Sequence, residues 1–252
     1  MDERRRVWAI GDIHGARDRL TVLLRAATII DSGNHWQAGA CTGISVGDYL
    51  NRGENGAGVM TLLRQWQSEA QQVGGELISL AGNHDILMIG VLAERQRAAF
   101  GELASRWLLN GGRFLDLETL EHDHATQAWL RDLPAMALVA DTLYIHSDSL
   151  IYCDLGNSIA EVNANVHTIL HSGDLDLIAK LFDQLCRRHE LRDPAAVDRL
   201  LRTFGGSRVV HGHSPFFGTA PVISPDGRCI NIEGGLWEPD EGETLGFVYW
   251  AP

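Results

Sequence analysis

The fold of this chain is decided by the stretch Ser45-Val46-Gly47-Asp48-Tyr49-Leu50-Asn51-Arg52-Gly53. Here a short apolar run stops at a glycine and a carboxylate, and an arginine follows. The same arrangement, an apolar run that ends beside a residue able to bind metal, recurs along the chain. It is found at Gly11-Asp12-Ile13-His14-Gly15, Gly82-Asn83-His84-Asp85, Tyr144-Ile145-His146 and Val209-Val210-His211-Gly212-His213. The repetition predicts several strands that deliver polar side chains to their ends.

Amphipathic segments follow the first two of these strands. Apolar residues at the spacing i, i+3, i+4 and i+7 predict helices over about 20–27 and 59–66. Later helices are expected over about 158–171, 175–189 and 195–204. Strands are expected over about 7–10, 41–46, 76–81, 135–140, 141–146, 208–211, 228–232 and 244–250. This alternation predicts an α/β fold with its chemistry at the strand ends.

Chain length and net charge limit the number of domains and the kinds of binding partner that we expect. The chain has 252 residues and a formal net charge of −12. We expect one domain over residues 1–252, in which about 95–134 form a helical insertion or lid over the site. The acidic balance argues against a nucleic acid polymer as partner. The N-terminal apolar run Val7–Ile10 is too short for a signal sequence or a membrane span, which predicts a cytoplasmic protein without a membrane partner.

The strand-end turns supply a mixed set of oxygen and imidazole ligands. Its members are Asp12, His14, Asp48, Asn83, His146 and His213. Such a set suits Mn²⁺, Fe or Zn²⁺, whereas an all-oxygen set suits Mg²⁺ or Ca²⁺. Six ligands are more than one tetrahedral ion needs, so we expect two divalent ions, with Mn²⁺ preferred, that share a bridging carboxylate. Asp48, in the middle loop, is the natural bridge.

Two such ions about 3.5–4 Å apart can activate a water and clamp the oxygens of a phosphoryl group, which predicts hydrolysis. Arg52 can offer a planar fork to the phosphate oxygens that do not react. His84 can protonate the leaving oxygen. Taken singly, these residues have simpler interpretations: Asp-x-His as a helix cap, Asn83 as a turn residue and His146 as a core histidine. The number of companions favours the metal interpretation.

The blocks at 11–15, 47–53 and 82–85 resemble, in this order, the three signature blocks of the calcineurin-like metallophosphoesterases. Within that superfamily the chain is similar to the phosphoprotein phosphatase branch, including its bacterial and Shewanella-like members. The branch has a histidine after a later strand and a final Gly-His, which are matched here by His146 and Gly212-His213. The resemblance covers about positions 7–215.

This resemblance implies a four-layer αββα sandwich, two facing mixed sheets flanked by helices, with the metals at the sheet ends. It implies that Asp12, His14 and Asp48 hold the first metal. The second metal would be held by Asp48, Asn83, His146 and His213. It also implies that Arg52, Asn83 and His84 meet the substrate phosphate and that His84 is the general acid.

The chain departs from the family pattern at several positions. The family's aspartate before the arginine is Asn51 here, and that aspartate normally pairs with the acid histidine and favours its charged form. We therefore predict that His84 has a lower pKa than in the parent pattern. Asp85 replaces a glutamate, and Ser147-Asp148 replace two glycines after His146. A second phosphate-binding arginine is not identified, and the candidates are Arg113, Arg202 and Arg208.

Three further histidines are left with open roles. His211 precedes His213 by two residues, so strand alternation would put both on one face. It is interpreted either as a ligand or as a support for the ligands. His122 and His124, on either side of Asp123, could bind metal, but a solvated turn in the lid is the preferred interpretation.

Three functions are kept. The first is a phosphomonoesterase acting on phosphorylated proteins or peptides, on phosphoserine and phosphothreonine or on phosphotyrosine, or on a small phosphorylated substrate. The second is symmetrical hydrolysis of a dinucleoside polyphosphate such as diadenosine tetraphosphate. The third is a catalytically weakened module that binds phosphate, an idea motivated by Asn51. Because all six metal-ligand candidates are present, an active hydrolase is preferred.

Overall fold

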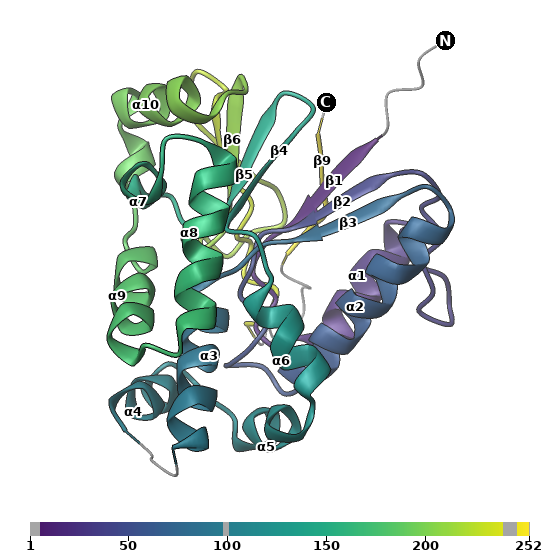
Figure 1. Ribbon diagram of the computed structural model, residues 1–252. Coiled ribbons are helices and arrows are strands. Elements are labelled where there is room, and N and C mark those ends of the chain that lie inside the picture. Colours follow the sequence, from purple (N-terminus) through teal and green to yellow (C-terminus); the bar gives the residue numbers. More distant parts are fainter. Residues whose placement is uncertain (1–5, 98–100, 239–245, 252) are drawn as a thin grey trace.

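The computed structural model describes residues 6–97, 101–238 and 246–251. Two β-sheets lie side by side with helices on their outer sides (Figure 1). The space between the sheets is filled by a cluster of buried apolar side chains that both sheets supply, including Ile44, Val46, Tyr144 and Val210. These two sheets with their outer helices confirm the predicted α/β sandwich.

The first sheet has the strand order β3-β2-β1-β9. Its strands are β1 (Val7–Ile10), β2 (Thr42–Ser45), β3 (Glu76–Ser79) and β9 (Tyr249–Trp250). The pairs of β1 with β2 and of β2 with β3 are parallel, so their carboxyl ends lie at one edge. Helices α1 (Arg17–Ala26) and α2 (Gly56–Gln72) run along the outer side of this sheet (Figure 1).

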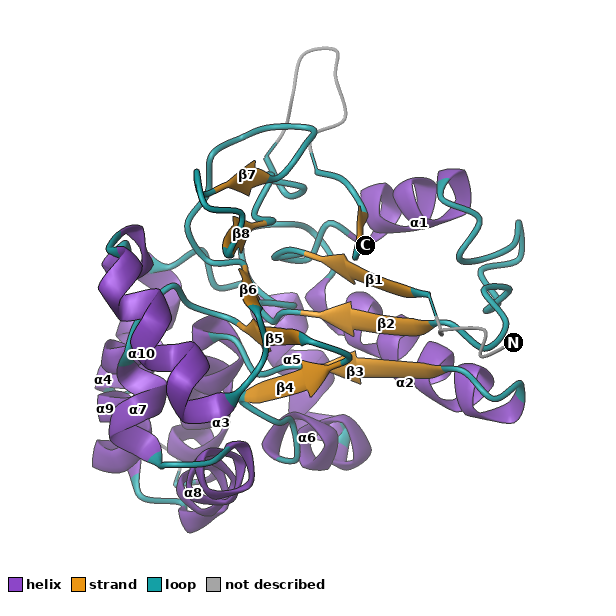
Figure 2. Cartoon of the chain, turned by 90° about the horizontal axis from the view of Figure 1, so that it is seen from above, coloured by secondary structure: helices purple, strands orange, loops and turns teal. Residues whose placement is uncertain are grey.

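The second sheet has the order β4-β5-β6-β8-β7. Its strands are β4 (Met136–Val139), β5 (Thr142–Ile145), β6 (Arg208–His211), β7 (Val222–Ile223) and β8 (Cys229–Asn231). The pairs of β5 with β6 and of β6 with β8 are parallel. Seen from above, the carboxyl ends of β1 and β2 point toward the second sheet (Figure 2). The strand-end turns of both sheets are thereby brought together.

The remaining helices surround the second sheet and extend below both sheets (Figure 1). They are α3 (Asn83–Gln96), α4 (Glu102–Leu109), α5 (Phe114–His122), α6 (His124–Arg131), α7 (Ile151–Leu155), α8 (Ile159–Ser172), α9 (Leu175–Leu185), the 3₁₀ turn η1 (Glu190–Arg192) and α10 (Pro194–Phe204). No helix among the described residues has the length and apolar character needed to cross a membrane.

Most predicted elements agree with these bounds, and the differences have physical causes. Helix α3 escapes a periodicity search because its side chains are buried on all faces from Asn83 to Glu94. The short elements α7 and β7 have too few residues for a period to show. Of the predicted strand 244–250, only Tyr249–Trp250 is a strand, and residues 244 and 245 lie outside the described residues. Within the range 95–134, which was predicted to be a helical insertion or lid, the chain forms the helices α4, α5 and α6, and residues 98–100 also lie outside the described residues.

Candidate metal centre at the strand ends

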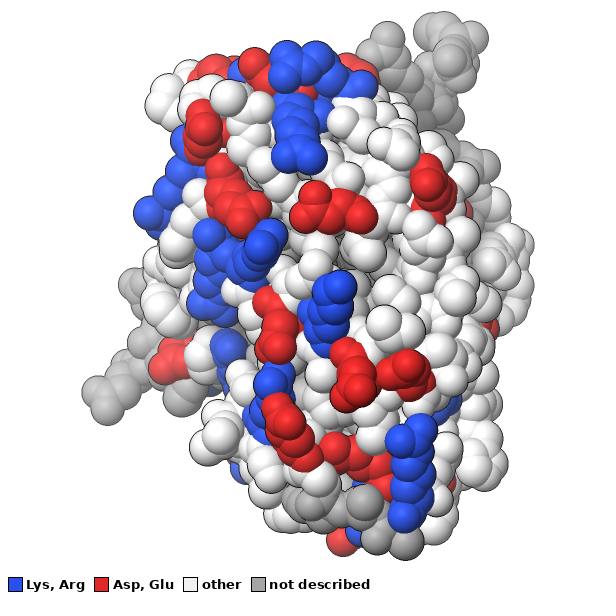
Figure 3. Space-filling view, turned by 60° about the vertical axis from the view of Figure 1, so that its left-hand side comes forward, with Lys and Arg blue, Asp and Glu red and all other residues white. Residues whose placement is uncertain are grey.

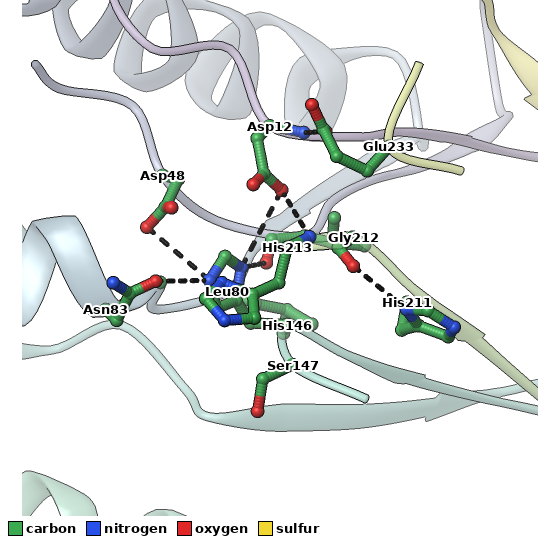
Figure 4. A network of polar contacts seen from close by, with 12 residues as sticks. Asp12, Asp48, Leu80, Asn83, His146, Ser147, His211, Gly212, His213 and Glu233 are labelled. Carbon is green, nitrogen blue, oxygen red and sulfur yellow. Dashed lines mark hydrogen bonds and ion pairs between the residues drawn. The ribbon is translucent and has the colours of Figure 1, made fainter. Parts of the chain in front are cut away.

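Five strand ends supply the side chains of the site. Asp12 and His14 follow β1, Asp48 follows β2, Asn83 and His84 begin α3 after β3, His146 follows β5 and His213 follows β6. All of them are at most 3% exposed. Figure 4 shows the side chains of Asp12, Asp48, Asn83 and His146 converging from these separate elements. The structure thus brings together all six predicted metal ligands.

The turns that carry these residues have unusual backbone conformations. His14, Asp48 and His213 have positive φ angles of 45°, 56° and 65°, and Asn51 and Arg52 follow with 69° and 64°. A non-glycine residue in this region costs about 1–3 kcal/mol, and such residues gather at functional sites. The surrounding hydrogen bonds hold the turns: the amide nitrogens of Ile13 and His14 both donate to the Asp48 carbonyl.

Gly82 allows the loops after β2 and β3 to touch. A Cβ atom at this position would overlap both the Oδ1 and the backbone nitrogen of Asp48. The amide nitrogen of His84 donates to Asp48 Oδ1 at 2.9 Å. The glycine of the third block is therefore required by a close approach of two backbones.

One group of ligand atoms surrounds His146. Its Nδ1 donates to the carbonyl of Val46 at 2.9 Å, so its Nε2 lone pair points inward. That Nε2 lies 2.9 Å from Asn83 Oδ1 and 3.5 Å from Asp48 Oδ1. The Asn83 amide is oriented by its Nδ2, which donates to Cys186 Sγ at 3.4 Å. Burial raises the pKa of the Cys186 thiol to about 11, so the thiol stays protonated.

A second group lies on the other side of Asp48. His14 Nδ1 donates to the Leu50 carbonyl at 2.9 Å, which leaves Nε2 facing the carboxylates. This Nε2 lies 3.6 Å from Asp48 Oδ2 and 3.9 Å from Asp12 Oδ2. The two oxygens of Asp48 therefore face different groups of candidate ligands.

These residues fit divalent metal ions. Ligand atoms of Asp12, Asp48, His146 and His213 all lie within 4.8 Å of one another, and so do those of His14, Asp48 and His84. His213 Nδ1 is buried without a hydrogen-bond partner, while Arg188 Nε donates to its Nε2 at 3.1 Å. Because Nε2 accepts this bond, the proton of neutral His213 is on Nδ1, so a cation at Nδ1 would require the proton to move to Nε2 and the bond from Arg188 to be given up.

The burial of the candidate ligands changes the pKa values of their side chains. Burial raises the pKa of Asp12 to about 6 and that of Asp48 to about 7. Burial likewise lowers the pKa of His14 and of His213 well below the usual value. Neutral imidazoles are the form that binds a metal, and a cation bound here would favour the ionised form of the two carboxyls.

His84 is held by Asn51 and Trp107. The indole Nε1 of Trp107, on α4, donates to Asn51 Oδ1 at 2.8 Å, and because indole only donates, this bond fixes the orientation of the amide. The Asn51 Nδ2 then lies 2.7 Å from His84 Nδ1, which must accept. The remaining proton of His84 is on Nε2, which faces Asp48 Oδ2 at 4.0 Å. The pKa of His84 is lowered well below its usual value by burial and then by Arg52.

Two arginines flank this centre. The guanidinium of Arg52 lies 4.4 Å from the ring centroid of Trp237, and its backbone nitrogen donates to the Gly111 carbonyl. Arg188, after α9, is bonded to His213 and also acts electrostatically on Asp48 and His84. The sequence search did not select Arg188, because it lies in no motif and follows a helix rather than a strand.

A cavity of about 510 Å³ opens beside Arg52. Arg17, Arg52, Arg113 and Trp237 are among its lining residues. Arg113 also donates from Nε to the Gly53 carbonyl at 3.1 Å. Of the three arginines predicted as a second phosphate ligand, Arg113 thus lies beside Arg52, whereas Arg202 is an exposed residue of α10 that pairs with Asp198. Arg208 begins β6, at the opposite end from His213.

Three buried carboxylates support the turns without being ligand candidates. Asp85 accepts hydrogen bonds from the amide nitrogens of Asp48, Tyr49 and Gly82. Glu233 Oε2 accepts from the Asp12 nitrogen at 2.7 Å (Figure 4). Asp148 accepts from the Ser214 hydroxyl at 2.7 Å, so the departure after His146 ties the His146 loop to the His213 loop. Glu233 and Asp148 carry no sequence signal, since each acts on a loop distant in the chain.

The other histidines lie outside this centre. His211 Nδ1 donates to the Gly212 carbonyl, and its ring points away from the cluster (Figure 4). Strand alternation fails here because β6 ends at His211 and His213 has a positive φ. His122 and His124 are exposed, and Asp123 between them caps α6 by accepting from the Thr126 nitrogen. Neither belongs to the groups that could hold a metal among the described residues.

Comparisons with known proteins show the family to which the chain is similar. The family model described as calcineurin-like phosphoesterase matches residues 5–217. Shewanella-like protein phosphatase 2 of Arabidopsis thaliana is 33% identical over 89 residues, which are 35% of this chain and 23% of that protein. Serine/threonine-protein phosphatase 1 of Salmonella typhimurium is 29% identical over 125 residues, 49% of this chain and 47% of that protein. The matches thus span about a quarter to a half of the length of these relatives.

A solved structure has the same fold. The cold-active protein-tyrosine phosphatase of a psychrophilic Shewanella species superposes with a TM-score of 0.72 and 23% identity, over 92% of this chain and 72% of that one. The resemblance to the Shewanella-like phosphatases predicted from the three blocks is confirmed by these matches.

Proposed function

Since the chain belongs to the calcineurin-like phosphoesterase family, we propose that it is a metal-dependent phosphoric ester hydrolase whose substrates are phosphorylated proteins or peptides. The observation that carries the proposal is the convergence of Asp12, Asp48, His146 and His213 within 4.8 Å at the ends of four strands. The names of the two curated relatives above support a protein substrate.

We propose that two divalent ions, Mn²⁺ in the first place, bind on the two sides of Asp48. Asp12 and His14 would complete one site, and Asn83, His146 and His213 the other. When bound, the ions supply a water of lowered pKa and neutralise charge on the phosphoryl oxygens. His84 and Arg52 would then face the phosphoryl group, and the buried surroundings would strengthen their electrostatic interactions with it.

The cationic and donor groups would position the substrate. Arg52 and Arg188 flank the centre from opposite loops and can each donate to phosphate oxygens that do not react. His84 holds its Nε2 proton toward the same space and can donate it to the leaving oxygen. Asn51 acts through His84 by fixing which of its nitrogens carries the proton.

The cavity beside Arg52 supports a second candidate, hydrolysis of a dinucleoside polyphosphate. Its volume of about 510 Å³ falls in the range of small-molecule sites. The Trp237 ring and the four arginines in its wall, Arg17, Arg19, Arg52 and Arg113, could stack a base and bind distal phosphates. A peptide with a second anionic group would use the same cations.

The surface charge argues against long anionic polymers as substrates. On the face in Figure 3, basic and acidic side chains are interleaved, and the chain has a net charge of −12. A phosphorylated nucleic acid polymer would meet repulsion across such a surface.

Product analysis separates these candidates. The Mn²⁺-loaded protein is incubated in parallel with a phosphotyrosine peptide, a phosphothreonine peptide and diadenosine tetraphosphate, with an Asp48→Asn variant as the control for metal-dependent turnover. Inorganic phosphate from a peptide supports the proposed activity and identifies the preferred residue. ADP from the dinucleotide with intact peptides would replace it by the second candidate. Inactivity on all three by a protein that binds Mn²⁺ would indicate the phosphate-binding module.

A further inference from the structure

A third group of possible metal ligands lies on the surface, and it shares no residue with the strand-end centre. It consists of Asp132, directly after α6, and of His167 and His171 on α8. The Nε2 atoms of the two histidines lie 3.4 Å and 2.9 Å from the same oxygen, Asp132 Oδ1. All three side chains are between 40% and 59% exposed, so the group is open to solvent.

The two imidazoles are arranged in parallel. His167 and His171 are four residues apart, so they lie on one face of α8. Their ring centroids are 4.1 Å apart, with an interplanar angle of 26°. Both rings therefore present Nε2 in the same direction, toward the end of α6. Two histidines at this spacing on a helix are a recurrent metal-binding arrangement.

The distance between α6 and α8 is held by a partly buried residue on the same face of α8. Asn163, one turn before His167, accepts from the amide nitrogens of Ala135 and Met136 and donates to the Met136 carbonyl. These bonds fix the connection from Asp132 to β4 against α8. The ligand atoms are consequently preorganised by the fold, which reduces the ordering cost of binding.

We propose that Asp132, His167 and His171 form a second kind of metal site, for a borderline divalent transition-metal ion such as Zn²⁺. Two imidazoles and one carboxylate suit Zn²⁺, Cu²⁺ or Ni²⁺ and are poor ligands for Mg²⁺ or Ca²⁺. Three protein ligands leave the fourth tetrahedral position to water. Bound there, the ion links the end of α6 to α8. Without an ion, the same residues form only exposed His–Asp pairs, which contribute little to stability.

The proposal is tested by equilibrium dialysis, which measures the number of Zn²⁺ ions bound per molecule of each of three purified proteins. They are the native chain, His167→Ala/His171→Ala, and His122→Ala/His124→Ala, which removes two exposed histidines elsewhere. We expect the first variant to retain one equivalent fewer than the native chain and the second variant to match the native chain. Equal retention by all three proteins at a Zn²⁺ concentration that saturates the native chain would overturn the proposal.

A single-residue variant provides an independent measurement. Asp132→Asn keeps both imidazoles and the folded surface. We expect this variant to bind the additional Zn²⁺ ion with an affinity at least about tenfold lower than that of the native chain. Zn²⁺ should also raise the melting temperature of the native chain more than that of Asp132→Asn. An identical Zn²⁺ affinity and an identical temperature shift in the two proteins would contradict the assignment. Mn²⁺-dependent turnover should be unchanged in all these variants, which separates this result from the strand-end centre.

Discussion

Replacing Asn51 by aspartate should make His84 a more effective general acid, because it should increase the fraction of His84 that is protonated near neutral pH. In the native chain, a proton on His84 Nδ1 would face the Asn51 amide N–H at 2.7 Å. Turning the amide would relieve that contact, but it would leave the buried Trp107 Nε1 without its acceptor. An unsatisfied buried donor costs about 1–3 kcal/mol, and this cost falls on the protonated form of His84 and so lowers its pKa.

In Asn51→Asp, one carboxylate oxygen keeps the hydrogen bond from Trp107 and the other accepts from His84 Nδ1–H. An opposite charge at this distance typically raises the pKa of a histidine by about 1–3 units. The sign is clear: a raised pKa means that the protonated form persists to higher pH. Above both pKa values, the protonated fraction of His84 increases by about 10- to 1,000-fold, because each unit is a factor of ten.

The assay is the pH–rate profile with two substrates of different leaving groups. A phosphothreonine peptide releases an alkoxide and needs a proton, so its rate near neutral pH should rise by up to the same factor. The aryl ester p-nitrophenyl phosphate releases a stable phenolate and should change much less. The alkaline limb for the peptide should move up by about 1–3 pH units.

A matched variant and a stability measurement complete this test. Trp107→Phe removes the donor that fixes the amide, so it should shift the profile in the same direction by a smaller amount. Thermal unfolding of each variant establishes that the fold is intact. If folded Asn51→Asp kept the native pH–rate profile and kcat on both substrates, the proposed control of His84 by Asn51 would be wrong.

Three further predictions follow from the supports of the site. Burial raises the pKa of Asp12 to about 6 and that of Asp48 to about 7, so both carboxyls are largely protonated below these pH values. Mn²⁺ binding at pH 6 should therefore release protons, and the Mn²⁺ affinity should fall as the pH falls. Calorimetry in two buffers of different ionisation enthalpy measures the protons released, and a value of zero would contradict this prediction. Gly82→Ala should destabilise the fold by about 1–3 kcal/mol and reduce Mn²⁺ affinity, since its Cβ would overlap Asp48; unchanged denaturant unfolding and Mn²⁺ titration would refute the close-packing argument. Glu233→Ala should lower the free energy of unfolding by about 1–3 kcal/mol, because it leaves the Asp12 backbone nitrogen without its acceptor. Glu233→Gln can still accept this hydrogen bond and should be less destabilised. Equal melting temperatures of the two variants would count against the role given to Glu233.

The local pattern of the sequence determined much of this protein. Short apolar runs specify buried strands, and glycine and polar residues at their ends specify turns, because these preferences act over a few neighbouring residues. The six metal-ligand candidates could therefore be placed at strand ends before their positions in space were known. Parallel strands then bring such ends together, which the structure shows for Asp12, Asp48 and His146.

The tertiary structure alone decided which distant groups act on these residues. Trp107 fixes the Asn51 amide from a helix 56 residues away, and Arg188 reaches His213 from the end of α9. The ring of His211 points away from the metal-ligand candidates, because β6 ends at this residue and the strand alternation that would place it beside His213 does not continue. The pairing of Asp132 with His171 spans 39 residues and depends on how α6 packs on α8. Such contacts depend on the register and angle of packed elements, and a local pattern of residue types does not encode them.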